Sequence, residues 1–117
     1  MKTILVVDDE VDMRDAVQAI LEGEGYRVQS AANGKQALDL LERGERPDLL
    51  LLDVMMPVLT GYQLLDRMHE RPDLRVLPVV MMSAVEPPSR KGPRWRTFLI
   101  KPFSLEDLLK AVTDAIL

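Results

Sequence analysis

The chain has 117 residues, of which 47% are hydrophobic and 29% are charged, and its formal net charge at pH 7 is −4. These values exclude a disordered chain, and the absence of cysteine excludes a disulfide scaffold, a Cys-ligated metal centre and a thiol nucleophile. A single histidine argues against a multi-histidine metal site, no apolar run approaches the roughly 20 residues of a membrane span, and acidic residues follow the N-terminus too soon for a signal peptide. We therefore expect one soluble, cytoplasmic domain over residues 1–117, without membrane partners.

Apolar runs and segments of helical period alternate along the chain. In chain order, the pattern predicts a strand over Thr3–Val7, a helix over Asp12–Glu22, a strand over Tyr26–Ala31, a helix over Gly34–Arg43, a strand over Asp48–Leu52, a helix over Gly61–Arg71, strands over Leu77–Met82 and Thr97–Ile100, and a helix over Ser104–Leu117. Most strand runs are unbroken apolar runs, as in parallel strands covered on both faces. This alternation indicates right-handed βαβ units and a parallel sheet.

The segment between Ser83 and Thr97 departs from this alternation, because it contains three prolines and a glycine. Proline inside a helix costs about 3 kcal/mol or more, so we expect a loop with at most one helical turn. The segment also holds the only tryptophan, Trp95, among the basic residues Arg90, Lys91, Arg94 and Arg96. We favour a solvated loop whose indole covers the core; a basic loop that binds a partner is the alternative.

Polar side chains follow four of the predicted strands: Asp8 and Asp9 the first, Asp53 the third, Ser83 the fourth and Lys101 the fifth. In a parallel sheet these carboxyl ends share one edge, where ligands bind. Two unit charges about 4 Å apart repel by about 4 kcal/mol at an effective dielectric near 20, so the carboxylates need a cation. Magnesium prefers a few carboxylates together with water and substrate phosphate oxygens. The pattern therefore predicts a magnesium-assisted phosphoryl site.

Asp53 is the candidate nucleophile of this site, because it stands alone at the end of an apolar strand and a carboxylate can accept a phosphoryl group as an acyl phosphate. Lys101 and Ser83 suit phosphate oxygens, as a compact cation and a hydroxyl donor. Taken singly, each residue has an ordinary interpretation: Asp8 and Asp9 as helix caps, and the others as turn or solvated residues. Their joint placement at four strand ends supports the site.

The motifs ILVVDDE (Ile4–Glu10), LLLLDVMMPVLTGYQLL (Leu49–Leu65), VVMMSA (Val79–Ala84) and LIKPF (Leu99–Phe103) have the order and spacing of one protein family. With them the whole chain resembles a response-regulator receiver domain of the chemotaxis-regulator type, the phospho-acceptor of two-component signalling. The resemblance implies an α/β, doubly wound, flavodoxin-like three-layer fold with five parallel strands in order 2-1-3-4-5. The proline-rich segment implies that the usual fourth helix is shortened or missing.

The resemblance also implies roles for the site residues. Asp53 is expected to be the phosphorylated aspartate, and Lys101 to pair with the phosphate, with a cis peptide bond to Pro102. Mg²⁺ is expected to be held by the metal ligands, which are Asp8, Asp9, Asp53 and the Met55 backbone carbonyl. The protein would then be a signalling phospho-acceptor, which catalyses only its own phosphorylation and dephosphorylation.

Ser83 and Phe98 resemble the switch hydroxyl and the rotating aromatic residue of receiver domains. The implied partners are a sensor histidine kinase or phosphotransfer protein and a downstream target protein or output domain; the negative net charge argues against direct nucleic-acid binding. The alternative within the family is a degenerate receiver that acts as a phosphorylation-independent interaction module. A haloacid-dehalogenase-type phosphatase would carry its nucleophile after the first strand, and a flavodoxin-like FMN protein would carry a Ser/Thr/Gly-rich loop there, so both fit poorly.

Overall fold

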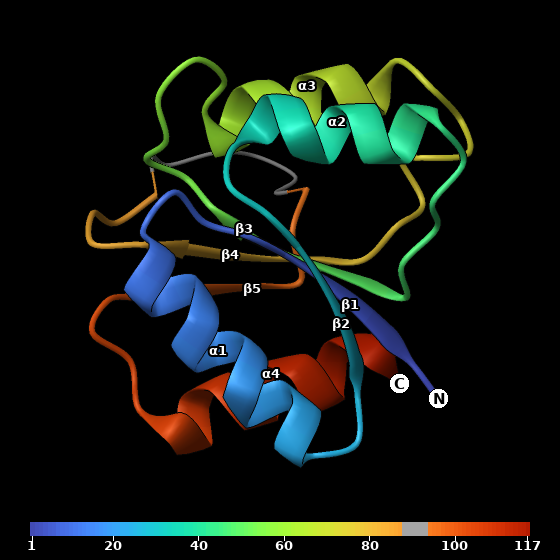
Figure 1. Ribbon diagram of the computed structural model, residues 1–117. Helices are drawn as coiled ribbons and strands as arrows, with labels where there is room; N and C mark the ends of the chain where they lie inside the picture. The colour runs from blue at the N-terminus through green and yellow to red at the C-terminus, as the bar shows by residue number, and fades with distance from the viewer. Residues whose placement is uncertain (88–93) are drawn as a thin grey trace.

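The computed structural model describes residues 1–87 and 94–117, in which five strands and four helices alternate (Figure 1). In chain order they are β1 (Thr3–Val7), α1 (Val11–Gly23), β2 (Arg27–Ala31), α2 (Gly34–Glu42), β3 (Leu49–Asp53), α3 (Gly61–His69), β4 (Val79–Ser83), β5 (Thr97–Ile100) and α4 (Leu105–Ile116). Arg90 and Lys91 of the predicted basic loop lie outside the described residues. All predicted elements are present, and their ends differ from the predicted ones by at most a few residues.

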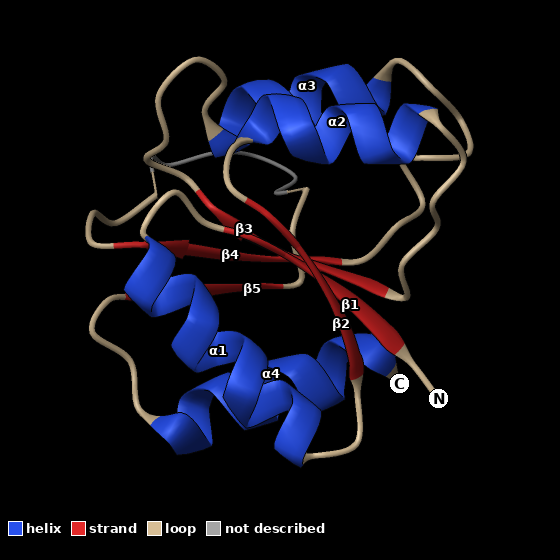
Figure 2. Cartoon of the chain, in the orientation of Figure 1, coloured by secondary structure: helices blue, strands red, loops and turns tan. Residues whose placement is uncertain are grey.

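The strands form one parallel sheet in the order β2-β1-β3-β4-β5, as predicted. Helices α1 and α4 cover one face of the sheet, and α2 and α3 cover the other (Figure 2). The three layers and the strand order make this a doubly wound, flavodoxin-like fold. Its carboxyl strand ends, which lie at the left of Figure 1, share one edge of the sheet.

The core has two halves, one on each face of the sheet. In β3, Leu50 and Leu52 pack toward α2 and α3, whereas Leu49 and Leu51 pack toward α1 and α4. All four leucines are fully buried. Burying a leucine side chain contributes about 1.5–3 kcal/mol, so a strand covered on both faces needs apolar residues at consecutive positions. This explains the unbroken apolar run in the sequence.

Three of the helices begin at side-chain caps that fix where the chain leaves the sheet. The Asn33 and Ser104 side chains accept hydrogen bonds from the third residue of α2 and α4, and Thr60 with Gln63 forms the predicted reciprocal capping box of α3. Helix α1 begins at Val11, and Glu10, the residue before it, makes no side-chain capping hydrogen bond. The interpretation of the first acidic pair as helix caps is therefore wrong.

Strands β3 and β4 each end one residue later than predicted. The amide of Val54 donates to the Met82 carbonyl (2.9 Å), and that of Lys101 donates to the Ser83 carbonyl (2.8 Å). These bonds continue the ladder past the apolar runs, because backbone pairing does not depend on whether the last side chain is polar. Asp53 and Ser83 are therefore the last residues of their strands, held by the sheet itself.

The connection between β4 and β5 contains no helix in its described parts, residues 84–87 and 94–96. This agrees with the predicted shortening or loss of a helix at this position. Trp95, Phe98 and Tyr62 pack together against the core half that faces α2 and α3. The indole of Trp95 therefore covers the core, as the favoured interpretation of its segment predicts. Across the residues that are described, we find no helix both long and apolar enough to span a membrane.

Candidate functional site

The register of the sheet brings the predicted site residues to one edge. Val7 of β1 pairs with Leu52 of β3. Asp8 and Asp53, which directly follow these two residues, therefore lie side by side at the carboxyl ends of the strands. Ser83 pairs with Ile100, so Lys101 follows one step further on the neighbouring strand. Parallel pairing thus converts distant sequence positions into one cluster.

The three carboxylates of this cluster are close together. Asp8, Asp9 and Asp53 each offer an oxygen atom within 4.8 Å of the others. Asp8 is fully buried and Asp53 is 2% exposed, whereas Asp9 is exposed at the rim. Two carboxylates of the cluster are therefore shielded from the solvent, and the third faces it.

Lys101 partly compensates for the negative charge of the buried pair. Its Nζ lies 3.1 Å from Oδ2 of Asp8, to which it donates a hydrogen bond, and 3.4 Å from Oδ1 of Asp53. Burial alone would lower the pKa of Lys101, but the charge of Asp53 and the hydrogen bond and charge of Asp8 outweigh burial and raise it. Lys101 therefore stays a cation across the physiological pH range.

Asp53 is the carboxylate most strongly affected by its surroundings. Burial raises the pKa of its carboxyl from 3.8 to about 6; the charge of Lys101 opposes this increase, and the charges of Asp8 and Asp9 add to it. At neutral pH the group is mostly ionised. A partly desolvated, ionised carboxylate at a strand end has the properties of a nucleophile.

The donor set fits a hard divalent cation. Three carboxylates with one lysine leave a net negative site of oxygen ligands, which suits Mg²⁺ and offers no sulfur or nitrogen ligand for a softer metal. The exposed Asp9 leaves the solvent side open for water and phosphate oxygens. The fourth predicted ligand, the carbonyl of Met55, belongs to the loop after β3 and stays a prediction.

Two contacts that the sequence analysis did not identify hold Asp8 in place. The amide of Glu10 donates to Oδ1 of Asp8 (2.9 Å), and Nη1 of Arg14 donates to the Asp8 carbonyl (2.8 Å). Arg14 lies in the first turns of α1, where a cation is disfavoured by the helix dipole. A basic residue at this place in the helix is the only hint in the sequence, and it does not identify the Asp8 carbonyl as the partner.

The loop after β3 is held tightly against the strand by Gly61. A Cβ atom at Gly61 would lie 2.6 Å from the Asp53 carbonyl oxygen and 2.9 Å from the Val54 Cα. Only glycine allows α3 to begin this close to the strand end. Within the loop, the amide of Leu59 donates a hydrogen bond to the Pro57 carbonyl. The residue between them, Val58, has a φ of 71°. This is a γ-turn with a strained, β-branched central residue.

The two predicted switch residues lie on β4 and β5, Ser83 at the end of its strand and Phe98 two residues before the end of its own. Oγ of Ser83 is buried and accepts a hydrogen bond from the amide of Val85 (3.1 Å), so its hydroxyl proton is available to another acceptor. Phe98 is half-buried, and its ring meets that of Trp95 edge-on, with the centroids 5.6 Å apart. The peptide bond between Lys101 and Pro102 is cis, as the resemblance implies.

Comparison with known proteins agrees with this geometry. Residues 4–113 match the family described as "Response regulator receiver domain". The chain belongs to this family. Its members are signalling modules of two-component systems, and the receiver match covers every site residue described above.

The receiver has similar relatives in bacteria and plants. It is 40% identical to an uncharacterized 14.6 kDa protein of Leptolyngbya boryana over 93% of this chain and 86% of that one. It is 32% identical to the two-component response regulator ORR3 of Oryza sativa, covering 97% and 90% of the two chains. It is also 38% identical to the response regulator Rre1 of Synechocystis over 91% of this chain, but only 48% of Rre1.

Solved structures show the same fold for this receiver. The chemotaxis protein CheY4 of Vibrio cholerae superimposes with a TM-score of 0.87 at 31% identity, covering 98% of both chains. A receiver domain of a histidine kinase from Syntrophus aciditrophicus also gives 0.87, at 30% identity and with coverage of 99% and 90%. The fold is therefore shared with a chemotaxis protein and with the receiver domain of a histidine kinase.

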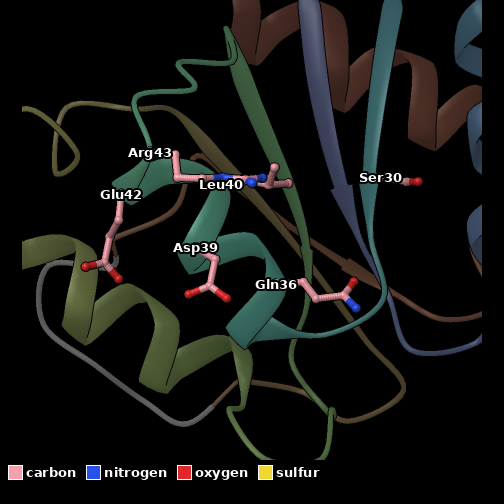
Figure 3. Close-up of a pocket in the computed structure, with 6 residues that line it drawn as sticks. All are labelled: Ser30, Gln36, Asp39, Leu40, Glu42 and Arg43. Carbon is pink, nitrogen blue, oxygen red and sulfur yellow. The ribbon is translucent and has the colours of Figure 1, made fainter.

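A pocket lies between β2 and α2 of the receiver, away from the acidic cluster (Figure 3). It has a volume of about 660 Å³ and is lined by Ser30, Gln36, Asp39, Leu40, Glu42 and Arg43. Gln36 and Arg43 reach toward β2, whereas Asp39 and Glu42 point away from the strand. This pocket contains none of the residues of the acidic cluster, so the two are separate features of the surface.

Proposed function

We propose that residues 1–117 form one receiver domain that accepts a phosphoryl group on Asp53 in a Mg²⁺-dependent reaction and then changes a partner-binding surface. The observation that carries this proposal is the position of Lys101, with its Nζ 3.1 Å from Asp8 and 3.4 Å from Asp53 beside the exposed Asp9. A buried nucleophile, a cation and an open acidic rim in a receiver fold suit the capture of a phosphoryl group. The domain would be a signalling phospho-acceptor that catalyses only its own phosphorylation and dephosphorylation.

The transfer uses groups that this chain supplies. An Oδ atom of ionised Asp53 attacks phosphorus, so an O–P bond forms while the bond from phosphorus to the donor breaks. The leaving group keeps that electron pair and takes up a proton from solvent. Lys101, which lies next to Asp53 Oδ1, would donate to a phosphoryl oxygen, and the hydroxyl of Ser83 would donate to another.

The acidic cluster would hold the metal. Asp8, Asp9 and Asp53 supply carboxylate oxygens, and the Met55 carbonyl is the proposed fourth ligand. Bound Mg²⁺ would neutralise charge on the phosphoryl oxygens as they approach the carboxylates. Two hydrogen bonds support this role, because the Glu10 amide holds one oxygen of Asp8 and Arg14 holds its backbone carbonyl.

The switch would act through Ser83 and Phe98. Phosphorylation adds about −1.5 to −2 charges and three acceptor oxygens at the edge of β3. Ser83 would turn toward one of these oxygens, and Phe98 would move into the space released. To change the active population from 1:99 to 99:1, phosphorylation must favour the active state by about 5.5 kcal/mol.

The proposed partners follow from this chemistry. A sensor histidine kinase or a phosphotransfer protein would supply the phosphoryl group, and a downstream target protein or output domain would read the changed surface. The proposed location is the cytoplasm, as the family resemblance implies. The domain is not proposed to bind nucleic acid directly.

The proposal is tested by incubating the protein with acetyl phosphate and Mg²⁺ and measuring its intact mass. We expect the mass of one added phosphoryl group, its loss when Mg²⁺ is chelated, and its loss in Asp53→Asn. Asp9→Ala should raise the Mg²⁺ concentration needed for half-maximal phosphorylation. Retention of the added mass in Asp53→Asn would move the acceptor to another residue.

The same measurement decides between this function and the degenerate receiver. The missing helix between β4 and β5 in the described residues is the observation that favours the degenerate receiver. That module would bind its partners without phosphorylation and would show no added mass with any small phosphodonor. The complete acidic cluster with Lys101 favours the phospho-acceptor.

A further inference from the structure

A second pocket lies at the opposite, amino-terminal edge of the sheet. It has a volume of about 370 Å³, and its walls are formed by Val76–Val79, which lead into β4, and Arg94–Arg96, which lead into β5. The amide of Arg96 donates to the Val79 carbonyl (2.7 Å), so the two walls are tied together by the sheet ladder. A strand rises about 3.3 Å per residue, which places this basic pocket roughly 13 Å from the Asp53 cluster.

The basic pocket carries positive charge that its surroundings do not fully neutralise. Arg94 pairs with Asp66 of α3 (2.5 Å). Among the described residues, neither Arg96 nor Arg75, next to the pocket wall, has an ion-pair partner. Burial and then the charges of Arg94 and Arg75 lower the pKa of nearby His69, while Asp66 opposes them. The guanidinium groups of Arg75 and Arg96, unpaired within the described residues, therefore give this surface local positive charge, although the chain carries −4 overall.

The pocket also presents apolar surface beside these charges. Val76 is 72% exposed, and Trp95 and Leu77 are half-buried. Arginine and tryptophan next to exposed aliphatic groups are typical of the residues that dominate the energy of protein interfaces.

We propose that this basic pocket binds an acidic segment of a partner protein, one that inserts an apolar side chain between flanking carboxylates. The pair of Asp66 with Arg94 shows that a carboxylate already fits a guanidinium at this wall. A volume of about 370 Å³ suits one or two side chains. A nucleic acid is disfavoured because few cations line the pocket and the net negative charge of the chain repels a polyanion.

Trp95 connects the basic pocket with the proposed switch. Its indole forms part of the pocket wall. The centroid of its ring lies 5.6 Å from that of Phe98, which it meets edge-on, and 5.9 Å from that of Tyr62, to which it is tilted. If Phe98 moves on phosphorylation, the surface beneath Trp95 changes, so the affinity of the pocket for its ligand should change as well. This coupling rests on the proposed function, and by linkage a segment bound in the pocket would shift the switch by the same factor.

The binding test uses the full chain and a fluorescein-labelled, blocked peptide with glutamates on both sides of a central leucine. At low salt, fluorescence anisotropy should show saturable binding, and the same peptide with glutamine in place of glutamate should not bind. Arg96→Gln and Arg75→Gln should each weaken binding about tenfold. The matched control, Arg27→Gln, removes an exposed arginine at the start of β2, the outer strand furthest from β5, and should leave binding unchanged.

Three results would overturn the proposed site: no binding of the glutamate peptide, an equal loss in Arg27→Gln, or equal affinity for the glutamine peptide. A single-stranded oligonucleotide that binds more tightly than the peptide and depends on Arg75 and Arg96 would replace the proposal with a nucleic-acid site. Conversely, an oligonucleotide that fails to displace the peptide supports the acidic segment.

The coupling is tested by repeating the titration after adding Mg²⁺ and beryllofluoride, which mimics the phosphoryl group. We expect at least about a fivefold change in peptide affinity, absent in Asp53→Asn. An unchanged affinity in a protein that acetyl phosphate does phosphorylate would refute the coupling but leave the pocket intact. If Asp53 accepts no phosphoryl group, peptide binding without beryllofluoride still decides the pocket, so the two failures are distinguishable.

Discussion

Removing the charge of Asp53 should stabilise the fold, because the site holds an ionised carboxylate that the folded protein disfavours. Asp53 is 2% exposed, and burial raises the pKa of its carboxyl from 3.8 to about 6 despite the nearby Lys101. In Asp53→Asn an amide of nearly the same shape replaces the carboxylate and keeps an acceptor for Lys101. We therefore expect this variant to unfold at higher denaturant concentration than the unmodified protein.

The magnitude and its pH dependence follow from the same pKa. A group with a raised pKa in the folded state contributes stability that is fully present below its ordinary pKa and is lost as the pH rises through the folded value. The gap between 3.8 and about 6 corresponds to about 3 kcal/mol in the free energy of unfolding. This pKa already includes the attraction to Lys101, and an amide does not reproduce every contact of a protonated carboxyl, so we expect a gain of about 1–3 kcal/mol above pH 7 that becomes small near pH 4.

The assay is urea unfolding of both proteins between pH 4 and 8, in a buffer containing a chelator. Asp39→Asn, which removes an exposed carboxylate on α2, is the matched control and should change stability by less than about 0.5 kcal/mol. Mg²⁺ should raise the stability of the unmodified protein and reduce the difference, because it binds only the intact carboxylate cluster. A variant that is less stable at pH 8, or a difference independent of pH, would refute the view that Asp53 is held at an energetic cost.

Three further outcomes test the loop after β3. Val58→Asn should raise the free energy of unfolding by about 1 kcal/mol, because asparagine tolerates a φ of 71° and the valine is 82% exposed; a loss of stability by urea unfolding would contradict strain at this turn. Gly61→Ala should destabilise the fold by about 1–3 kcal/mol and slow phosphorylation, because its Cβ would meet the Asp53 carbonyl at 2.6 Å; unchanged values for both would show that the loop yields freely. Met55→Asn should speed loss of the phosphoryl group by up to about 100-fold, because Met55 and Val85 are both 62% exposed at the proposed site and neither can orient a water molecule; decay of the unmodified phosphoprotein within seconds, followed by mass, would contradict this.

The parts of the fold that depend on local pattern could be predicted from the sequence. The capping box at Thr60 and Gln63 and the convergence of Asp8, Asp53 and Lys101 follow from apolar periodicity, cap residues and parallel pairing. The strand order was implied by the resemblance to receiver domains, because periodicity alone indicates a parallel sheet but not its order. The predicted ends of β3 and β4 were less accurate, because the ladder of backbone hydrogen bonds continues through Asp53 and Ser83 after the apolar runs stop.

The parts that depend on contacts between distant residues could not be predicted. The sequence pattern identifies Trp95 as a core-covering residue but does not show that it lies between Tyr62 and Phe98. It also does not show that α3 meets the end of β3 so closely that only Gly61 fits, or that Arg14 reaches back to the Asp8 carbonyl. Such contacts depend on the angles at which elements pack, which periodicity does not determine.

The central claim is that Asp53 itself becomes an acyl phosphate, and reductive trapping tests it most directly. The protein is phosphorylated with acetyl phosphate and Mg²⁺ and treated with borohydride, which reduces an acyl phosphate to an alcohol but leaves free carboxylates intact. Its peptides are then analysed by mass spectrometry. We expect homoserine at position 53, in amounts that fall when Mg²⁺ is chelated. Homoserine at Asp8 or Asp9, or no reduced aspartate in a protein that has gained phosphoryl mass, would contradict the account.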